Sequence, residues 1–289
     1  MRVILSPNPY RDHGLKATQS AQKILHSVGI ETAVCLPFDL DGGSRVDLPQ
    51  NLTYRKMEEA LPGADMLICF GGDGTILHAA KDAGFYGGVP ILGVNMGSVG
   101  FMAELEHSEL SLLNRLAGGN FTLEARMMLD VSVIREGKQV FHEVALNDAV
   151  ITKGAVARVV DLKIYGDKMM ITEFSGDGVI ISTPTGSTAY SMAAGGPIVE
   201  PTAENMIVTP ICAHALDAKS LVLGSDRLIS VRMGWLSRKT VYLSADGGRA
   251  FRLQDGDTVE VRKSERVTRL VRLSGRSFYE ILAKKFGRT

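Results

Sequence analysis

The chain has 289 residues, of which 45% are hydrophobic, and this allows a buried core in one large domain or in two ordinary ones. Lysine plus arginine number 32 and aspartate plus glutamate number 32, so the formal net charge is zero. A protein that grips nucleic acid usually carries a basic excess, because it must neutralise phosphates. The composition therefore argues against nucleic acid as a partner.

The three cysteines, Cys35, Cys69 and Cys212, are far apart and lack the CxxC or Cys/His spacing of a metal site. Such thiols are typical of a reducing cytosol. The first apolar run is too short for a signal peptide, and no stretch approaches the roughly 20 apolar residues that cross a bilayer. We expect a cytoplasmic protein with no metal site of its own and no membrane partner.

The first part of the chain alternates short apolar runs, typical of strands, with apolar residues at helical spacing. Buried strands are predicted at residues 3–5, 32–36, 66–70 and 89–94. Helices are predicted at 17–28 with Gly29 as the stop, at 75–83 with Gly84 as the stop, and at 108–116 between the cap Ser108 and Gly118-Gly119. Strands and helices at this spacing predict a parallel α/β sheet, with loop 38–50 as its most mobile segment.

From Phe121 to about Leu273 the pattern changes to short β-like runs broken by turns. Hairpin turns are predicted at Glu136-Gly137 and Gly166-Asp167, and one short helix, at 187–194, interrupts the strands. Apolar residues at helical spacing return after Ser277. We therefore predict an α/β domain over 1–122, a β-rich domain over 123–274 and a terminal helix within 275–289, which makes the protein α+β overall.

The glycine loop Gly71-Gly72-Asp73-Gly74 lies between a buried strand and a helix. Ligands bind beyond the carboxyl ends of such strands, and the amides at a helix N-terminus favour an anion. The loop is neither a Walker sequence nor a GxGxxG fingerprint. An acid beside a polyphosphate fits a general base or an indirect link to Mg²⁺. A plain Asp-Gly turn is the equal alternative on these four residues.

Two further segments suggest a nucleoside site. The run from Asp177 to Ser191 passes from a β-branched strand into a turn rich in hydroxyl groups, where Ser187 or Thr188 can cap a helix and Tyr190 offers a flat surface. The alternative is an ordinary capped helix with Tyr190 in the core. In the pair Asn147-Asp148, the amide can read an adenine edge and the carboxylate can accept ribose hydroxyls, but a common turn is the better reading of that pair alone.

The remaining polar candidates are weaker. Phe101, after the rim segment 95–100, suits base stacking or a core position, and His78 and His214 are expected to be structural. A solvated charge is the default for Lys153, Arg158 and Lys219, with phosphate contact as the alternative.

In combination these motifs resemble the NAD kinase family over nearly the whole chain. The resemblance rests on Gly71–Thr75, Asn95-Met96-Gly97 with Gly100-Phe101, Asn147-Asp148, the highly specific run from Thr183 to Pro197, and the closing segment 277–282. It implies transfer of the ATP γ-phosphate to the 2′-hydroxyl of the adenosine ribose of NAD. It also implies a Rossmann-like N-terminal domain, a β-sandwich C-terminal domain, a terminal helix that returns to the first domain, and a homodimer or homotetramer.

The resemblance also implies roles for single residues. Asp73 matches the proton acceptor, Gly74 a close backbone contact, and Asp177 the acid near the nicotinamide. Asn147 and Asp148 match the pair that holds the adenosine of NAD. The adenine site is matched by Thr188, Ala189 and Tyr190, continued by Ser191, Met192 and Ala193, and flanked by Arg158 and Ser175. Mg²⁺ is expected to arrive with ATP.

Three positions depart from the family pattern. Many members have Glu at Asp148 and Ser at Ala193, and Asp246-Gly247-Gly248 replaces a commoner Asp-Gly-Gln. None of these changes removes the proposed base. The alternatives to an NAD kinase are a lipid kinase with the same glycine loop and a catalytically silent NAD(P) sensor.

Overall fold

A computed structural model describes residues 1–37, 46, 48–97, 100–154, 158–215, 218–236 and 239–287. The chain forms two compact units, one of residues 1–125 with 268–289 and the other of residues 126–267. Most of the loop 38–50, for which mobility is predicted, lies outside the described residues.

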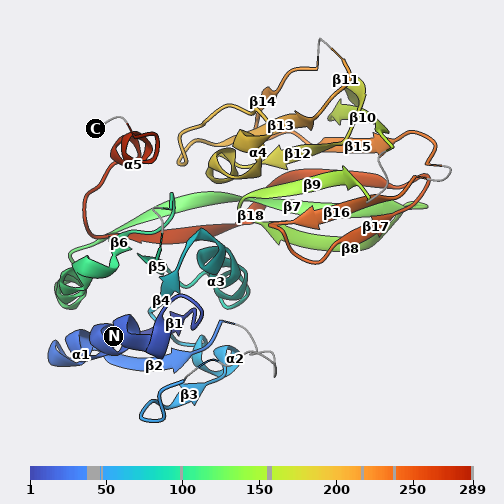
Figure 1. Cartoon of the computed structure of the whole chain (residues 1–289). Coiled ribbons are helices and arrows are strands. Elements are labelled where there is room, and N and C mark those ends of the chain that lie inside the picture. The colour runs from blue at the N-terminus through green and yellow to red at the C-terminus, as the bar shows by residue number, and fades with distance from the viewer. Residues whose placement is uncertain are drawn as a thin grey trace. The chain divides into compact units, whose positions relative to one another are not determined.

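The first unit contains the predicted parallel sheet (Figure 1). Its strands are β1 (Arg2–Pro7), β2 (Glu31–Cys35), β3 (Tyr54–Arg55), β4 (Met66–Gly71), β5 (Ile91–Asn95) and β6 (Leu105–Glu106). They lie in the order β3-β2-β1-β4-β5-β6, and each neighbouring pair is parallel. The order reverses between β1 and β4, and ligands of open α/β sheets bind at such a switch point, beyond the carboxyl ends of the strands.

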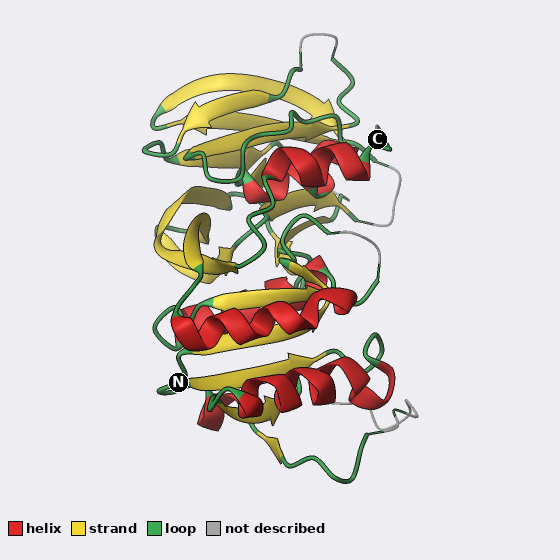
Figure 2. Ribbon diagram, turned by 90° about the vertical axis from the view of Figure 1, so that its left-hand side faces the viewer, coloured by secondary structure: helices red, strands yellow, loops and turns green. Residues whose placement is uncertain are grey.

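Helices complete this unit: α1 (Lys16–Ser27), α2 (Met57–Ala60), α3 (Asp73–Phe85), α5 (Phe278–Lys285), and the 3₁₀ segments His13–Leu15 and His107–Gly118. Apolar residues of α1 and of the second 3₁₀ segment share a buried cluster with alternate residues of the sheet. The longest helices are drawn in red in Figure 2.

Two predicted helix ends are wrong. Gly84 lies inside α3, which ends only where Gly87 and Gly88 adopt φ of 86° and 74°. A single glycine costs a helix only about 1 kcal/mol, so it need not stop one. Glu106, not Ser108, caps the following helix, through a reciprocal capping box with Glu109.

The second unit is a sandwich of two sheets. Its strands are β7 (Thr122–Arg135), β8 (Lys138–Ala145), β9 (Asp148–Lys153), β10 (Val160–Gly166), β11 (Met169–Gly176), β12 (Gly178–Ser182), β13 (Asn205–Ile211), β14 (Leu221–Gly224), β15 (Ile229–Met233), β16 (Val241–Ala245), β17 (Phe251–Leu253) and β18 (Thr258–Arg272). One sheet runs β8-β7-β18-β15-β10-β11 and the other β14-β13-β12-β9-β16-β17, and residues of both fill one apolar core. The predicted fold class, a Rossmann-like α/β part with a β-sandwich, is confirmed.

The turn predictions for the sandwich hold in part. Glu136 and Gly137 have φ of 49° and 75°, as a tight hairpin turn requires. Gly166, however, ends β10, and the turn begins at Asp167. The predicted helix 187–194 is two pieces, a 3₁₀ turn Thr185–Thr188 and α4 (Tyr190–Ala193), separated by Ala189.

The predicted cap of that helix is also wrong, because neither Ser187 nor Thr188 caps it. The Ser187 hydroxyl instead donates to the Pro184 carbonyl and accepts from the Val199 amide, 2.6 and 3.0 Å away. Within the described ranges, no helix has the length and apolar character to span a membrane.

Candidate functional site

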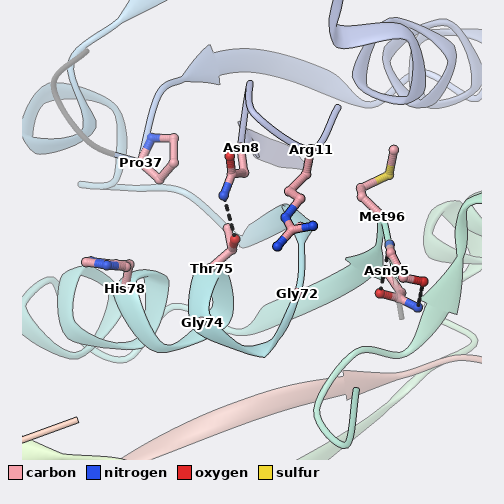
Figure 3. A pocket seen from close by; sticks show the side chains of 11 residues that line it. Asn8, Arg11, Pro37, Gly72, Gly74, Thr75, His78, Asn95 and Met96 are labelled. Carbon is pink, nitrogen blue, oxygen red and sulfur yellow. Dashed lines mark hydrogen bonds between the residues drawn. The ribbon is translucent and has the colours of Figure 1, made fainter. Parts of the chain in front are cut away.

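A pocket of about 330 Å³ lies at the switch point of the parallel sheet. Asn8 and Arg11 reach it from the segment after β1, Gly71 and Gly72 from the end of β4, and Met96 from the segment after β5 (Figure 3). The sheet topology explains why residues so far apart in sequence meet, because the carboxyl ends of parallel strands share one edge.

The pocket suits a phosphate. The first amides of α3 lack partners within the helix, and the helix dipole adds positive potential there. Arg11 adds a full positive charge, and Asn8 Nδ2 donates to Thr75 Oγ1 at 3.3 Å, which fixes the wall. The described residues that line the pocket include no Asp or Glu, so no carboxylate among them repels an anion. Sequence reasoning missed Asn8 and Arg11, although their place just after the first strand was a usable signal.

Asp73 does not line this pocket, although it begins α3 between two glycines that do. Its carboxylate accepts the backbone amide of Phe101 at 2.9 Å and that of Met102 at 3.2 Å. A Cβ on Gly100 would lie 2.2 Å from Asp73 Oδ1, so the close approach requires glycine. Each carboxylate oxygen keeps accepting capacity after these bonds, and a carboxylate held in this way can take a proton from a hydroxyl.

In the second unit, Asn147 lies in the turn between β8 and β9, and Asp148 is the first residue of β9. The Asp246 carboxylate accepts three successive amides there, from Leu146 at 2.7 Å, Asn147 at 2.7 Å and Asp148 at 3.0 Å. The Asp246 amide in turn donates to the Asp148 carbonyl at 2.9 Å. Asp246 has φ 49°, a left-handed conformation that aspartate tolerates better than most residues. Its role was not predicted from the sequence, where Asp246 was noted only as part of a triplet whose third residue, Gly248, departs from the family pattern.

The hydroxyl-rich turn packs directly on this pair. Thr183 donates its amide to the Asn147 carbonyl at 2.9 Å and its hydroxyl to the Leu146 carbonyl at 2.6 Å. A Cβ on Gly186 would lie 2.1 Å from the Asn147 carbonyl oxygen, so only glycine allows this contact. The structure thus brings together two segments that the sequence suggested separately as nucleoside sites.

The buried polar groups of this turn are suited to a ligand. Asn147 Oδ1 is one of three buried side-chain oxygens without a hydrogen-bond partner among the described residues. A donor such as an adenine amino group would satisfy it. Burial raises the pKa of the Asp148 carboxyl to about 7, and the charge of Asp246 adds to the effect.

The other predicted site residues of this unit differ in their surroundings. Tyr190 is 45% exposed, and Thr188, Ala189, Met192 and Ala193 are partly or fully exposed beside it. Ser191 is fully buried, and its hydroxyl lies 2.8 Å from that of Thr209. The Ser191 hydroxyl is therefore part of the interior of the unit. Tyr190 is not a core residue.

Asp177, the residue expected near the nicotinamide, lies apart from this cluster. Asp177 precedes β12 and Thr183 follows it, so six residue steps at roughly 3.3 Å each place them about 20 Å apart. Lys153 Nζ lies 2.7 Å from Asp177 Oδ1. The Ser175 hydroxyl donates to Asp161 Oδ1 at 2.5 Å, and Arg158 is exposed.

The chain is similar to known families in both halves. A family model described as the ATP-NAD kinase N-terminal domain matches residues 15–119, and one described as the ATP-NAD kinase C-terminal domain matches residues 146–273. An NAD kinase of Natranaerobius thermophilus is 39% identical over 98% of this chain and 96% of its own length. An NAD kinase of Symbiobacterium thermophilum is 46% identical over 78% of this chain and 79% of its own length.

Solved structures show the same likeness. The crystal structure of a yeast NADH kinase complexed with NADH has a TM-score of 0.86 at 25% identity and covers 100% of this chain and 88% of its own. An NAD kinase from Archaeoglobus fulgidus in complex with ATP shares the fold, with a TM-score of 0.75 at 24% identity over 99% of this chain and 98% of its own.

Proposed function

This chain belongs to the ATP-NAD kinase family, and we propose that it transfers the γ-phosphate of ATP to the 2′-hydroxyl of the adenosine ribose of NAD, which makes NADP. One observation carries the mechanism: the Asp73 carboxylate, at the head of α3, is held by two backbone amides and has accepting capacity left. It is the group that we assign to accept the hydroxyl proton.

We assign the two substrates to different units of the chain. We assign the ATP phosphates to the switch-point pocket, where Arg11 and the first amides of α3 supply positive charge. We assign the adenosine of NAD to the turn of Asn147 and Asp148, where the Asn147 Oδ1 acceptor has no partner in the described part of the chain. The relatives crystallised with NADH and with ATP support this choice of ligands.

In phosphoryl transfer the protein mainly positions the reacting groups and stabilises their charge. Asp73 accepts the proton as the 2′-oxygen attacks the γ-phosphorus, and the bond from that phosphorus to the β,γ-bridging oxygen of ATP breaks. Mg²⁺, held mainly by the phosphates of ATP, would offset their charge when bound. The absence of Asp and Glu from the described lining of the pocket fits a metal that the nucleotide, rather than a set of protein carboxylates, holds. We also propose a homodimer or homotetramer in the cytoplasm, as the family resemblance implies.

The test is an assay of the purified chain with ATP, Mg²⁺ and NAD, in which NADPH is read through a coupled dehydrogenase. We expect NADP formation, and a strong loss of turnover with little loss of NAD binding in Asp73→Asn. Wild-type turnover in that variant would refute the base assignment. No NADP with any divalent metal would favour the silent sensor, and phosphorylation of a lipid hydroxyl would favour the lipid kinase.

A further inference from the structure

The C-terminal helix α5 contacts the residue that holds Asp73. The Phe278 ring of α5 lies 6.3 Å from the ring of Phe101, centroid to centroid, and Lys285 Nζ lies 5.5 Å from the Phe101 ring centroid. These are distances for an aromatic pair and for a cation over an aromatic face. Phe101 is only 8% exposed, and α5 is one of the elements that contact its ring.

Phe101 serves two neighbours at once. Its ring meets α5, and its backbone amide donates to Asp73 Oδ2 at 2.9 Å. The next amide, of Met102, donates to Asp73 Oδ1 at 3.2 Å. Gly100, the residue before Phe101, has no side chain that could fix the position of this segment. A displacement of the Phe101 ring therefore moves the donors that aim the Asp73 carboxylate.

Charges hold α5 at both ends. Arg276, just before the helix, forms an ion pair with Glu109, and Lys284 lies 3.8 Å from Glu106. Ser277 caps the helix in a reciprocal box with Glu280. An isolated helix of eight residues is not stable in water, so these contacts and the Phe101 face determine whether α5 forms.

Among the described residues, none of α5 belongs to the buried cluster beneath the sheet of the first unit. No residue of α5 is fully buried, and Tyr279 and Phe286 are 67% and 50% exposed. Loss of the Phe278 ring therefore removes a contact with Phe101 but opens no cavity in the buried cluster beneath the sheet.

We propose that α5 is a positioning element for the reaction: through Phe278 and Phe101 it fixes the two amides that aim the Asp73 carboxylate at the acceptor hydroxyl. The proposal rests on the role assigned to Asp73 above. It makes Phe278 and Phe101 positioning residues, because neither has to touch a substrate to act.

The test compares Phe278→Ala with Phe286→Ala, a control just past the end of the same helix whose ring is half exposed. We expect a roughly tenfold or larger fall in kcat for Phe278→Ala, since small misplacements of reacting groups have effects of this size. KM for NAD and for ATP should stay within about twofold, because the assigned binding residues are untouched. The control should retain wild-type kcat, and Phe278→Tyr, which keeps the ring, should restore most of it.

A double-mutant cycle separates positioning from general damage. If α5 acts through Asp73, then Phe278→Ala lowers kcat little further in an Asp73→Asn background. An equal loss in both backgrounds, or wild-type kcat for Phe278→Ala, would overturn the proposal. If Phe278→Ala does not fold, Phe278→Leu replaces it in the cycle, because it keeps most of the apolar volume. Wild-type turnover in Asp73→Asn alone would instead refute the base assignment on which this proposal rests, and absence of NADP formation by the wild-type chain would overturn the proposed function.

Discussion

Replacement of Asp148 by asparagine should make the second unit more stable at neutral pH. Burial raises the pKa of this carboxyl to about 7 in the folded chain, with the charge of Asp246 as the second cause. In the unfolded chain the group has its ordinary value of 3.8. Between these values the folded state keeps a proton that the unfolded state has released, so the free energy of unfolding falls as pH rises.

The magnitude follows from the two pKa values. Each pH unit between them lowers the free energy of unfolding by about 1.36 kcal/mol, and roughly three units give roughly 4 kcal/mol between pH 4 and pH 7. An asparagine side chain has nearly the same shape as that of aspartate and does not titrate. The free energy of unfolding of Asp148→Asn therefore does not fall with pH through this group. The variant should match the wild type near pH 4 and exceed it by up to roughly 4 kcal/mol near pH 8.

Urea unfolding of both proteins at pH 4, 5.5, 7 and 8, followed by circular dichroism of the β-rich unit, measures this difference. Titrating groups that do not interact with Asp148 are common to the two proteins and cancel in the comparison. A wild-type minus variant difference that stays constant over this range would show that Asp148 titrates normally, and the argument from burial would be wrong.

Two substitutions test the supports of the site. Asp246→Asn should weaken NAD binding about tenfold or more, because the asparagine side chain offers one acceptor oxygen to three amides and turns an N–H toward one of them. Titration calorimetry with NAD measures the affinity. An unchanged affinity would show that Asp246 does not support NAD binding. Gly100→Ala should lower kcat roughly a hundredfold, because the new Cβ would lie 2.2 Å from Asp73 Oδ1 and push the carboxylate aside. Steady-state kinetics of that variant, with melting temperature as the control for folding, would contradict this if kcat stayed near the wild-type value.

Elements whose signals are local could be predicted from the sequence. The apolar runs at 3–5, 66–70 and 89–94 lie in or overlap β1, β4 and β5, and the Glu136-Gly137 turn adopts the positive φ values that a tight hairpin requires. Burial of apolar side chains and backbone sterics act within a few residues, so they are readable from a short window. The glycine loop and the Asn147-Asp148 pair were recognisable for the same reason.

The contacts of these motifs, in contrast, depend on the three-dimensional fold. Asp246 holds Asn147 from 99 positions along the chain, and the Phe101 amide reaches Asp73 from 28 positions away. Ser191 belongs to a predicted binding run, yet its hydroxyl lies in the interior against Thr209. Hydrogen bonds of this kind depend on which strand ends and turns the fold brings together. Neither residue type nor spacing predicts which of these segments become neighbours.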